Sequence, residues 1–146
     1  MMPNSKPRNA RGFTFLEIMF VVVIIGVLMA IAIPRFAGRA QEARISATEA
    51  TMNGIRTALS QYEMHVGSFP STTEGLEALM ERPNSVDEDM WEGPYIEGDE
   101  VPVDSWKQPF NYVSPGTKKR DYDLWSNGPD RQEGTDDDIT NWSKKK

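Results

Sequence analysis

A cluster of acidic residues near the C-terminus is the stretch whose composition most clearly suggests chemistry. It lies in the segment 127–139, which reads NGPDRQEGTDDDI and places five carboxylates around two glycines. Calcium binds six to eight oxygen atoms from carboxylates and carbonyls, on loops that glycine allows to bend. The segment lacks the D-x-D-x-D-G spacing of an EF-hand. By composition it is compatible with a calcium site or with a solvated acidic loop.

A single carboxylate in a long apolar run is the second chemical signal. Glu17 is the only charged residue among the 21 residues from Phe13 to Ile33. A helix of that length spans roughly 31 Å, about the hydrocarbon thickness of a bilayer, so the run predicts a transmembrane helix. An ionised carboxylate there costs several kcal/mol unless it is partnered. Glu17 therefore either reaches the lipid headgroups or pairs with a cation from another subunit.

The remaining composition argues against catalysis and nucleic-acid binding. His65 is the only histidine and the chain has no cysteine, so no nucleophile and base pair is evident. The acidic residues lie on predicted loops, and we therefore expect no enzymatic activity. Residues 66–146 contain 18 acidic and 9 basic residues, a net charge of −9. Binding to nucleic acid needs a basic surface, so it is not expected.

Charge and hydropathy divide the chain into four parts. Residues 1–12 form a basic leader with three cations and no acid, 13–33 the apolar helix, 34–66 its amphipathic continuation, and 67–146 an acidic head. Basic flanks stay on the cytoplasmic side of a membrane, which puts the leader inside and the head outside. Small residues around Ile31 would also fit an ordinary signal-peptide cleavage after Ala32. That alternative predicts a soluble exported domain.

The head is predicted to fold on the second half of the long helix. Its core-facing stripe follows helical spacing and comprises Met52, Ile55, Leu59, Tyr62 and Val66. Gly67 and Pro70 should end the helix near residue 65, and the pair Ser71 and Glu74 should cap a short helix through about Arg82. That helix is expected to bury Leu76, Leu79 and Met80. Runs 104–113 and 122–126 with a Pro-Gly turn between them predict a β-hairpin.

The N-terminal pattern resembles that of type IV pilins and of the pseudopilins of type II secretion systems. Precursors in these families carry a basic leader ending in glycine, then phenylalanine, then glutamate as the fifth mature residue, as Gly12, Phe13 and Glu17 do. The resemblance implies cleavage by a prepilin peptidase between Gly12 and Phe13 and N-methylation of Phe13. It also implies that Glu17 serves filament assembly. In such filaments the helix can lose its regularity between the positions of Gly26 and Pro34.

The head resembles that of major pseudopilins in particular. The matching stretches are Phe69-Pro70, Thr72-Thr73-Glu74-Gly75-Leu76, Asp104-Ser105-Trp106-Lys107-Gln108-Pro109-Phe110-Asn111-Tyr112 and Asn141-Trp142. The resemblance implies an α+β, pilin-like fold, in which a long N-terminal helix with a transmembrane first half packs on a small head containing a short helix and a small antiparallel β-sheet. The missing cysteines disfavour a major type IV pilus subunit, which remains the alternative.

The same resemblance fixes expected partners, location and cofactor. It implies a homopolymer that also meets minor pseudopilins, the prepilin peptidase and an inner-membrane assembly platform. The precursor would be a single-pass inner-membrane protein whose head reaches the periplasm. It also implies a structural Ca²⁺ held by the side chains of Asp130, Asp136 and Asp137 and by the main-chain carbonyls of Asn127 and Gln132. The loop is shorter than in the family, so Asp138 could replace a neighbouring ligand.

Overall fold

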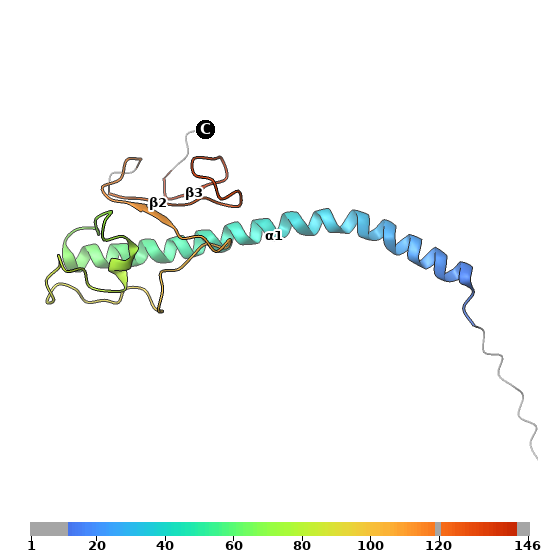
Figure 1. Ribbon diagram of the computed structural model, residues 1–146, viewed down its shortest axis with the longest axis horizontal. Coiled ribbons are helices and arrows are strands. Elements are labelled where there is room, and N and C mark those ends of the chain that lie inside the picture. The colour runs from blue at the N-terminus through green and yellow to red at the C-terminus, as the bar shows by residue number, and fades with distance from the viewer. Residues whose placement is uncertain (1–11, 119–120, 143–146) are drawn as a thin grey trace, which may run out of the picture. The chain divides into compact units, whose positions relative to one another are not determined.

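A computed structural model describes residues 12–118 and 121–142, without the side chains of residues 31–37. Its elements are the helix α1 (Phe15–Val66), the 3₁₀ helix η1 (Leu76–Leu79), and the strands β1 (Asn111–Val113), β2 (Asp123–Ser126) and β3 (Ile139–Thr140) (Figure 1). The chain divides into two compact units, residues 1–40 and residues 41–146. The predicted leader lies outside the described residues except for Gly12.

The first unit consists of the N-terminal part of α1. Every described side chain from Gly12 to Ala30 is exposed, and most of them are apolar. Across residues 12–118 and 121–142, no helix is both long and apolar enough to cross a membrane. The predicted span 13–33 runs into the segment 31–37, whose side chains are not described. The transmembrane helix therefore stays a prediction.

In the second unit, the predicted stripe of α1 forms the core. Met52, Ile55, Leu59 and Tyr62 are each at most 4 % exposed, and Val66 packs at the edge of the cluster. Each fully buried side chain of this size contributes about 1.5–3 kcal/mol, so this stripe is a main source of the head's stability. Gly67, at a φ of 87°, donates its N–H to the carbonyl of Glu63 and ends the helix as predicted.

The short helix after this turn is shorter than predicted. Ser71 and Glu74 do form a reciprocal capping pair, because Ser71 N–H donates to Glu74 Oε2 at 2.7 Å and Glu74 N–H to Ser71 Oγ at 3.3 Å. Gly75, at φ 65° and ψ −166°, then leaves helical geometry, so only η1 follows. The prediction of a helix to Arg82 was therefore wrong. Met80 is half-buried, and Ala78 is buried beside Leu76 and Leu79.

The sheet confirms the predicted hairpin and adds a strand. β1 pairs antiparallel with β2 and β2 with β3, in the order β1-β2-β3. Tyr112 lies opposite Leu124, whose side chain is fully buried in the core. Asn141 extends the pairing because its N–H donates to the carbonyl of Leu124 and its Oδ1 accepts from Leu124 N–H. The sequence analysis did not predict β3.

The first predicted strand begins seven residues later than expected. Residues 104–108 form a closed turn in which Asp104 N–H donates to the Gln108 carbonyl and Lys107 N–H to the Asp104 carbonyl. Lys107 has a φ of 62°, which a strand does not permit. The alternating aromatics at Trp106 and Phe110 are nevertheless both buried. The alternation that suggested a strand thus comes from one buried aromatic residue inside the turn and a second one just after it.

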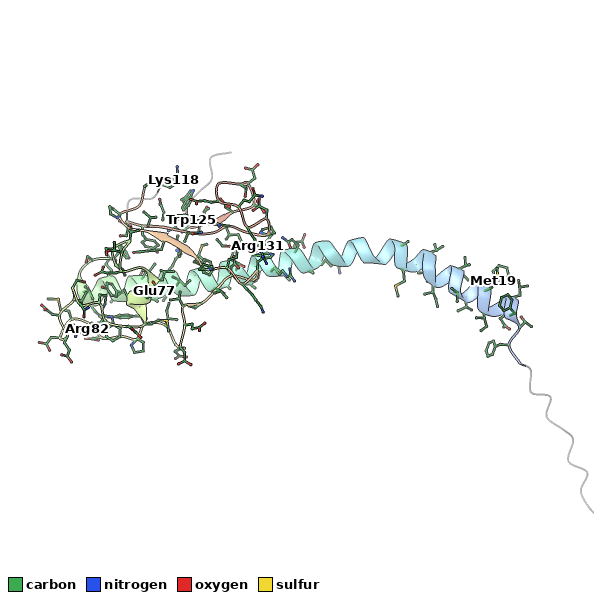
Figure 2. All side chains as sticks on the ribbon, viewed as in Figure 1. Met19, Glu77, Arg82, Lys118, Trp125 and Arg131 are labelled. Carbon is green, nitrogen blue, oxygen red and sulfur yellow. The ribbon has the colours of Figure 1, made fainter. Side chains whose placement is uncertain are left out.

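Aromatic contacts hold the long loop between η1 and β1 on the core. Trp91 Nε1 donates to the Ala78 carbonyl at 3.1 Å, and Tyr95 N–H to the Leu79 carbonyl at 2.7 Å. The Tyr95 ring meets the edge of Tyr62 at a centroid distance of 5.6 Å. Trp142 packs edge-on against Trp125, a half-buried residue of the sheet that is labelled in Figure 2.

Candidate functional site

The predicted processing site lies just before α1. Gly12 and Phe13 precede the helix, and the Phe13 side chain is 80 % exposed. A protease needs its substrate backbone in an accessible, non-helical form, and residues 12–14 meet that requirement. The geometry is thus compatible with cleavage after Gly12. The cleavage itself stays a prediction.

Glu17 caps the start of α1. Its N–H donates to Thr14 Oγ1 at 3.2 Å, and its Oε2 lies 3.5 Å from the N–H of Thr14. This is the Thr-x-x-Glu form of a capping box, in which side chains satisfy the free amides of the first helical turn. The Thr-x-x-Glu spacing was present in the sequence, but we did not predict a capping role for Glu17. The cap places the carboxylate one residue from Phe13, whose amine cleavage would free.

The other two predicted assembly positions are helical in this structure. α1 continues through Gly26 and Pro34 without a break in its helical assignment. A Cβ added to Gly26 would meet nothing within 4 Å. The loss of helicity expected between these residues concerns a filament, so it stays a prediction.

The acidic loop 127–139 folds back on itself, so that its first arm, which carries Gly128 and Asp130, lies beside its second arm, which carries Asp137. Asp130 N–H points at Asp137 Oδ2, 3.3 Å away. Gly128, at a φ of 65°, lies so close to the other arm that an added Cβ would be 2.4 Å from the Asp137 carbonyl oxygen. Only glycine can occupy that position, because it has no Cβ and tolerates positive φ. The arms carrying two of the predicted ligands are therefore adjacent.

Hydrogen bonds within the loop compensate its negative charge. Thr135 Oγ1 donates to Asp137 Oδ1 at 2.6 Å, and Gly134 N–H donates to Asp138 Oδ2 at 2.8 Å. The Thr135 hydroxyl holds the pKa of Asp137 below its ordinary value of 3.8, with smaller contributions from the Asp130 amide. Asp137 is therefore ionised at neutral pH, the state that a cation requires of its ligand.

The remaining predicted ligands are spread along the loop. Asn127 Oδ1 accepts from Asn111 Nδ2 at 2.8 Å, and Gln132 N–H donates to Asp130 Oδ1 at 2.8 Å. The Gln132 carbonyl accepts from Thr135 Oγ1 at 3.2 Å, and Asp136 is exposed. Among the residues that the structure describes, no three acidic or histidine side chains are gathered as a metal-binding group. The structure thus joins Asp130 with Asp137 and does not assemble the full predicted set.

The chemistry of this loop nevertheless fits a calcium ion. Its donors are carboxylate and carbonyl oxygens, which calcium prefers, and a glycine makes the close approach of the two arms possible. Asp138 lies on the same side of the loop as Gly134 and Thr135 and adds a further carboxylate. The loop thus contains oxygen donors of the kind that calcium binds, although the structure does not gather three of its acidic side chains around one point.

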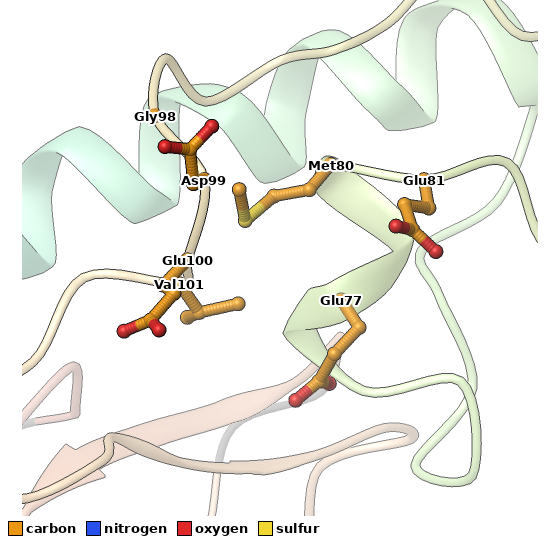
Figure 3. Close-up of a pocket in the computed structure, with 7 residues that line it drawn as sticks. All are labelled: Glu77, Met80, Glu81, Gly98, Asp99, Glu100 and Val101. Atoms are coloured by element: carbon orange, nitrogen blue, oxygen red, sulfur yellow. The ribbon is translucent and has the colours of Figure 1, made fainter.

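A separate acidic cavity of about 520 Å³ lies between η1 and the loop 98–101 (Figure 3). Four carboxylates line it, from Glu77, Glu81, Asp99 and Glu100, together with the apolar side chains of Met80 and Val101. Its lining contains neither histidine nor a hydroxyl side chain. The cavity therefore offers carboxylates and apolar side chains only.

Comparison with known proteins shows which family this chain resembles. The family described as type II secretion system (T2SS), protein G, matches residues 35–142, and the prokaryotic N-terminal methylation motif matches residues 7–33. The type II secretion system core protein G of Pseudomonas aeruginosa is 39% identical over 140 residues, which cover 92% of this chain and 96% of the relative. Its counterpart in Escherichia coli K12 is 40% identical over 93% of this chain and 94% of the relative.

A solved structure agrees with these relatives. The crystal structure of the major pseudopilin from the type 2 secretion system of enterohaemorrhagic Escherichia coli superposes with a TM-score of 0.59 at 29% identity. The match covers 73% of this chain and 92% of the other chain. The pilin-like fold predicted from the sequence is therefore confirmed. On these matches, this chain belongs to the type II secretion system protein G family, the major pseudopilins.

Proposed function

We propose that this chain is the repeating subunit of a periplasmic pseudopilus that drives protein export across the outer membrane. The observation that carries the proposal is the identity of 39% with a type II secretion core protein G, extending over 92% of the chain. Both parts of a filament subunit are included, because the methylation motif covers the N-terminal segment and the protein G family covers the head. The role is structural, in keeping with the family.

The N-terminal segment would serve first as a membrane anchor and then as the filament core. Phe15, Leu16, Ile18 and Phe20 are all at least 50 % exposed, an arrangement that needs either lipid or neighbouring helices to cover it. The prepilin peptidase would remove residues 1–12 and leave Phe13 with a free amine that is then methylated. Minor pseudopilins and an inner-membrane assembly platform would be the other partners.

Glu17 would guide assembly through charge. In an apolar filament core, the Glu17 carboxylate of one subunit can neutralise the Phe13 amine of its neighbour, which relieves two desolvation costs at once. The capping contacts to Thr14 already hold the carboxylate at the helix end where that amine would arrive. A neutral side chain at position 17 would leave the amine without a partner and remove the axial register.

Replacing Glu17 separates processing from assembly. We expect Glu17→Ala to be cleaved normally, since the scissile bond is untouched, but to yield few pseudopilus filaments when overproduced with the secretion system. Glu63→Ala removes the same group from an exposed site elsewhere on α1 and is the matched control. Filaments are counted by electron microscopy of sheared cells. Abundant filaments from Glu17→Ala would contradict the assembly role.

Intact mass and N-terminal sequencing test the processing step. The mature subunit should begin at Phe13 and be heavier by one methyl group, about 14 Da. A soluble chain that begins at Ile33 would instead support ordinary signal-peptide cleavage and overturn the filament proposal.

The acidic loop would bind a structural calcium ion. Asp130, Asp136 and Asp137 would supply carboxylates, the carbonyls of Asn127 and Gln132 would complete the set, and Asp138 is a possible replacement. The ion would tie the two arms of the loop together and so add its binding free energy to that of folding. The support is the contact of the Asp130 N–H with the Asp137 carboxylate and the glycine, Gly128, that lets the two arms approach each other.

Removing calcium should therefore lower the thermal stability of the head. At a free calcium concentration about 100 times the dissociation constant, the ion adds about 2.7 kcal/mol, which a chelator abolishes. Asp137→Asn should lose this response, whereas Glu133→Gln, an exposed carboxylate outside the proposed set, should keep it. The measurement is the unfolding midpoint by circular dichroism with calcium or chelator. An unchanged midpoint in the wild type would refute the site.

A further inference from the structure

A buried carboxylate outside the proposed ligand set lies at the root of the acidic loop. Asp104 is 4 % exposed and accepts three hydrogen bonds. Its Oδ1 accepts from the amides of Trp106 at 2.9 Å and Gln108 at 2.8 Å, and its Oδ2 accepts from Ser126 Oγ at 2.6 Å. Burying a carboxyl group is costly unless it is hydrogen-bonded, and the three donors around Asp104 offset that cost.

Ser126 links Asp104 to the acidic loop. Its side chain is fully buried at the end of β2, and its Oγ accepts from Gly128 N–H at 3.1 Å while donating to Asp104. Gly128 is the residue whose backbone lies against the Asp137 carbonyl. A continuous buried chain therefore runs from Asp104 through Ser126 to the place where the two arms meet.

The turn that carries Asp104 is itself fixed to α1. Ser105 N–H donates to Thr48 Oγ1 at 3.1 Å, and Ser105 Oγ donates to the Arg44 carbonyl at 2.9 Å. Thr48 is completely buried on α1. A second link leaves this turn toward the loop, since Arg131, labelled in Figure 2, donates from Nη2 to the Trp106 carbonyl at 3.3 Å. Turn 104–108 thus connects the loop to the helix within the head.

We propose that Asp104 and Ser126 are positioning residues that set the calcium affinity of the loop without binding the ion. The inference rests on the calcium site proposed above. Asp104 fixes the hydroxyl of Ser126, and that hydroxyl accepts from the Gly128 N–H. The arm of the loop that carries Gly128 is therefore ordered before calcium binds. A ligand loop that is ordered in advance loses less conformational entropy when it binds. Partners of this kind around metal sites typically contribute 10- to 100-fold in metal affinity.

Two variants break the chain at different atoms. Asp104→Asn keeps an oxygen for the two amides but turns an NH₂ group toward Ser126, so the serine hydroxyl loses its acceptor. Ser126→Ala keeps Asp104 and removes the acceptor of Gly128 N–H. Ser105→Ala is the control, because it weakens the attachment of the same turn to α1 while leaving the Asp104–Ser126–Gly128 chain intact.

The experiment is calorimetric titration of calcium chloride into the full chain, stripped of metal and held in detergent. We expect Asp104→Asn and Ser126→Ala each to weaken calcium binding about 10-fold or more, and the double variant to be little weaker than either alone. Ser105→Ala should lower the unfolding midpoint without calcium and leave the affinity within about twofold of wild type. Circular dichroism of each metal-free variant confirms that it is folded.

The outcomes separate this inference from the calcium proposal itself. A wild-type chain that takes up no calcium refutes the site, and with it the inference. A wild-type chain that binds calcium, with unchanged affinity in folded Asp104→Asn and Ser126→Ala, refutes the positioning role alone. Equal losses of affinity in Ser105→Ala and Ser126→Ala would also overturn it, because they would show general destabilisation of the head.

Discussion

Two glycines of the acidic loop share a left-handed backbone but differ in their surroundings. Gly128 has a φ of 65° and Gly134 a φ of 87°. An added Cβ would meet the Asp137 carbonyl oxygen at 2.4 Å at the first position and nothing within 4 Å at the second. Substitution at Gly134 therefore incurs only the backbone strain of an L-residue, about 1–2 kcal/mol, whereas Gly128 adds a clash with the backbone of the opposite arm.

Gly128→Ala and Gly134→Ala consequently form a matched pair. We expect Gly134→Ala to lower the free energy of unfolding by about 1 kcal/mol, and Gly128→Ala by at least about 1 kcal/mol more. Chemical unfolding followed by tryptophan fluorescence measures both. Equal losses for the two variants would show that the arms do not approach as closely as the structure has them.

At the scale of single elements, the capping turn before η1 makes the stability of the head depend on pH in the acidic range. Glu74 accepts hydrogen bonds from the hydroxyl of Ser85 and from the amide and hydroxyl of Ser71, and these lower its pKa below the usual 4.5, the Ser85 contact most. A carboxyl whose pKa is depressed by folding stabilises the native state above its unfolded pKa. That stabilisation is lost as the pH falls through the folded pKa.

Glu74→Gln should therefore be less stable than wild type at neutral pH, by about 1 kcal/mol. The difference should shrink as the pH is lowered from about 6 to about 3, because the wild-type carboxyl becomes protonated and resembles the amide. Thermal unfolding of both proteins over this range, recorded with a chelator present, gives the comparison. A gap that stays constant with pH would mean that Glu74 contributes by packing and not by charge.

The elements also show which structural features local sequence patterns can predict. The helical stripe, the helix end at Gly67 and the Ser71–Glu74 cap were predictable because each depends on residues within one or two turns of helix. The turn at 104–108 and β3 were not, because both are fixed by distant partners. Asp104 is held by Ser126, 22 residues away, and Ser126 pairs in the sheet with Ile139. The apolar-polar alternation carries no information on such contacts.

For the candidate sites, the sequence allowed residue types to be predicted better than their geometry. The capping contacts at Thr14 and Glu17 follow a known short pattern that was present in the chain. The positioning chain from Asp104 was not foreseeable, since a lone aspartate between valine and serine has no local signature. The ligand register of the shortened loop depends on how its two arms close, which side-chain chemistry does not determine.

At the scale of the whole molecule, buried tyrosines connect the stability of the head to alkaline pH. Burial raises the pKa of Tyr62 to about 12 and that of Tyr112 to about 12, and it also raises the pKa of Tyr122. Tyr62 is 1 % exposed against α1 and the core, and the Tyr112 hydroxyl donates to the Pro70 carbonyl at 2.8 Å. These rings join the helix, the turn after it and the sheet, so their ionisation tests the packing of the entire head.

The expected pH dependence follows from the raised pKa values. Below about pH 10 both the folded and the unfolded tyrosines keep their protons, and the full stability is present. Between about pH 10 and 12 the unfolded chain releases protons that the native state retains, so the free energy of unfolding falls. For Tyr62 alone the loss from about pH 8 to about pH 11 is about 1.4 kcal/mol. Tyr62→Phe, which keeps the ring but not the phenol, should lose correspondingly less. Urea unfolding of the two proteins at both pH values measures the difference, and identical alkaline losses would show that Tyr62 is not buried as a neutral phenol.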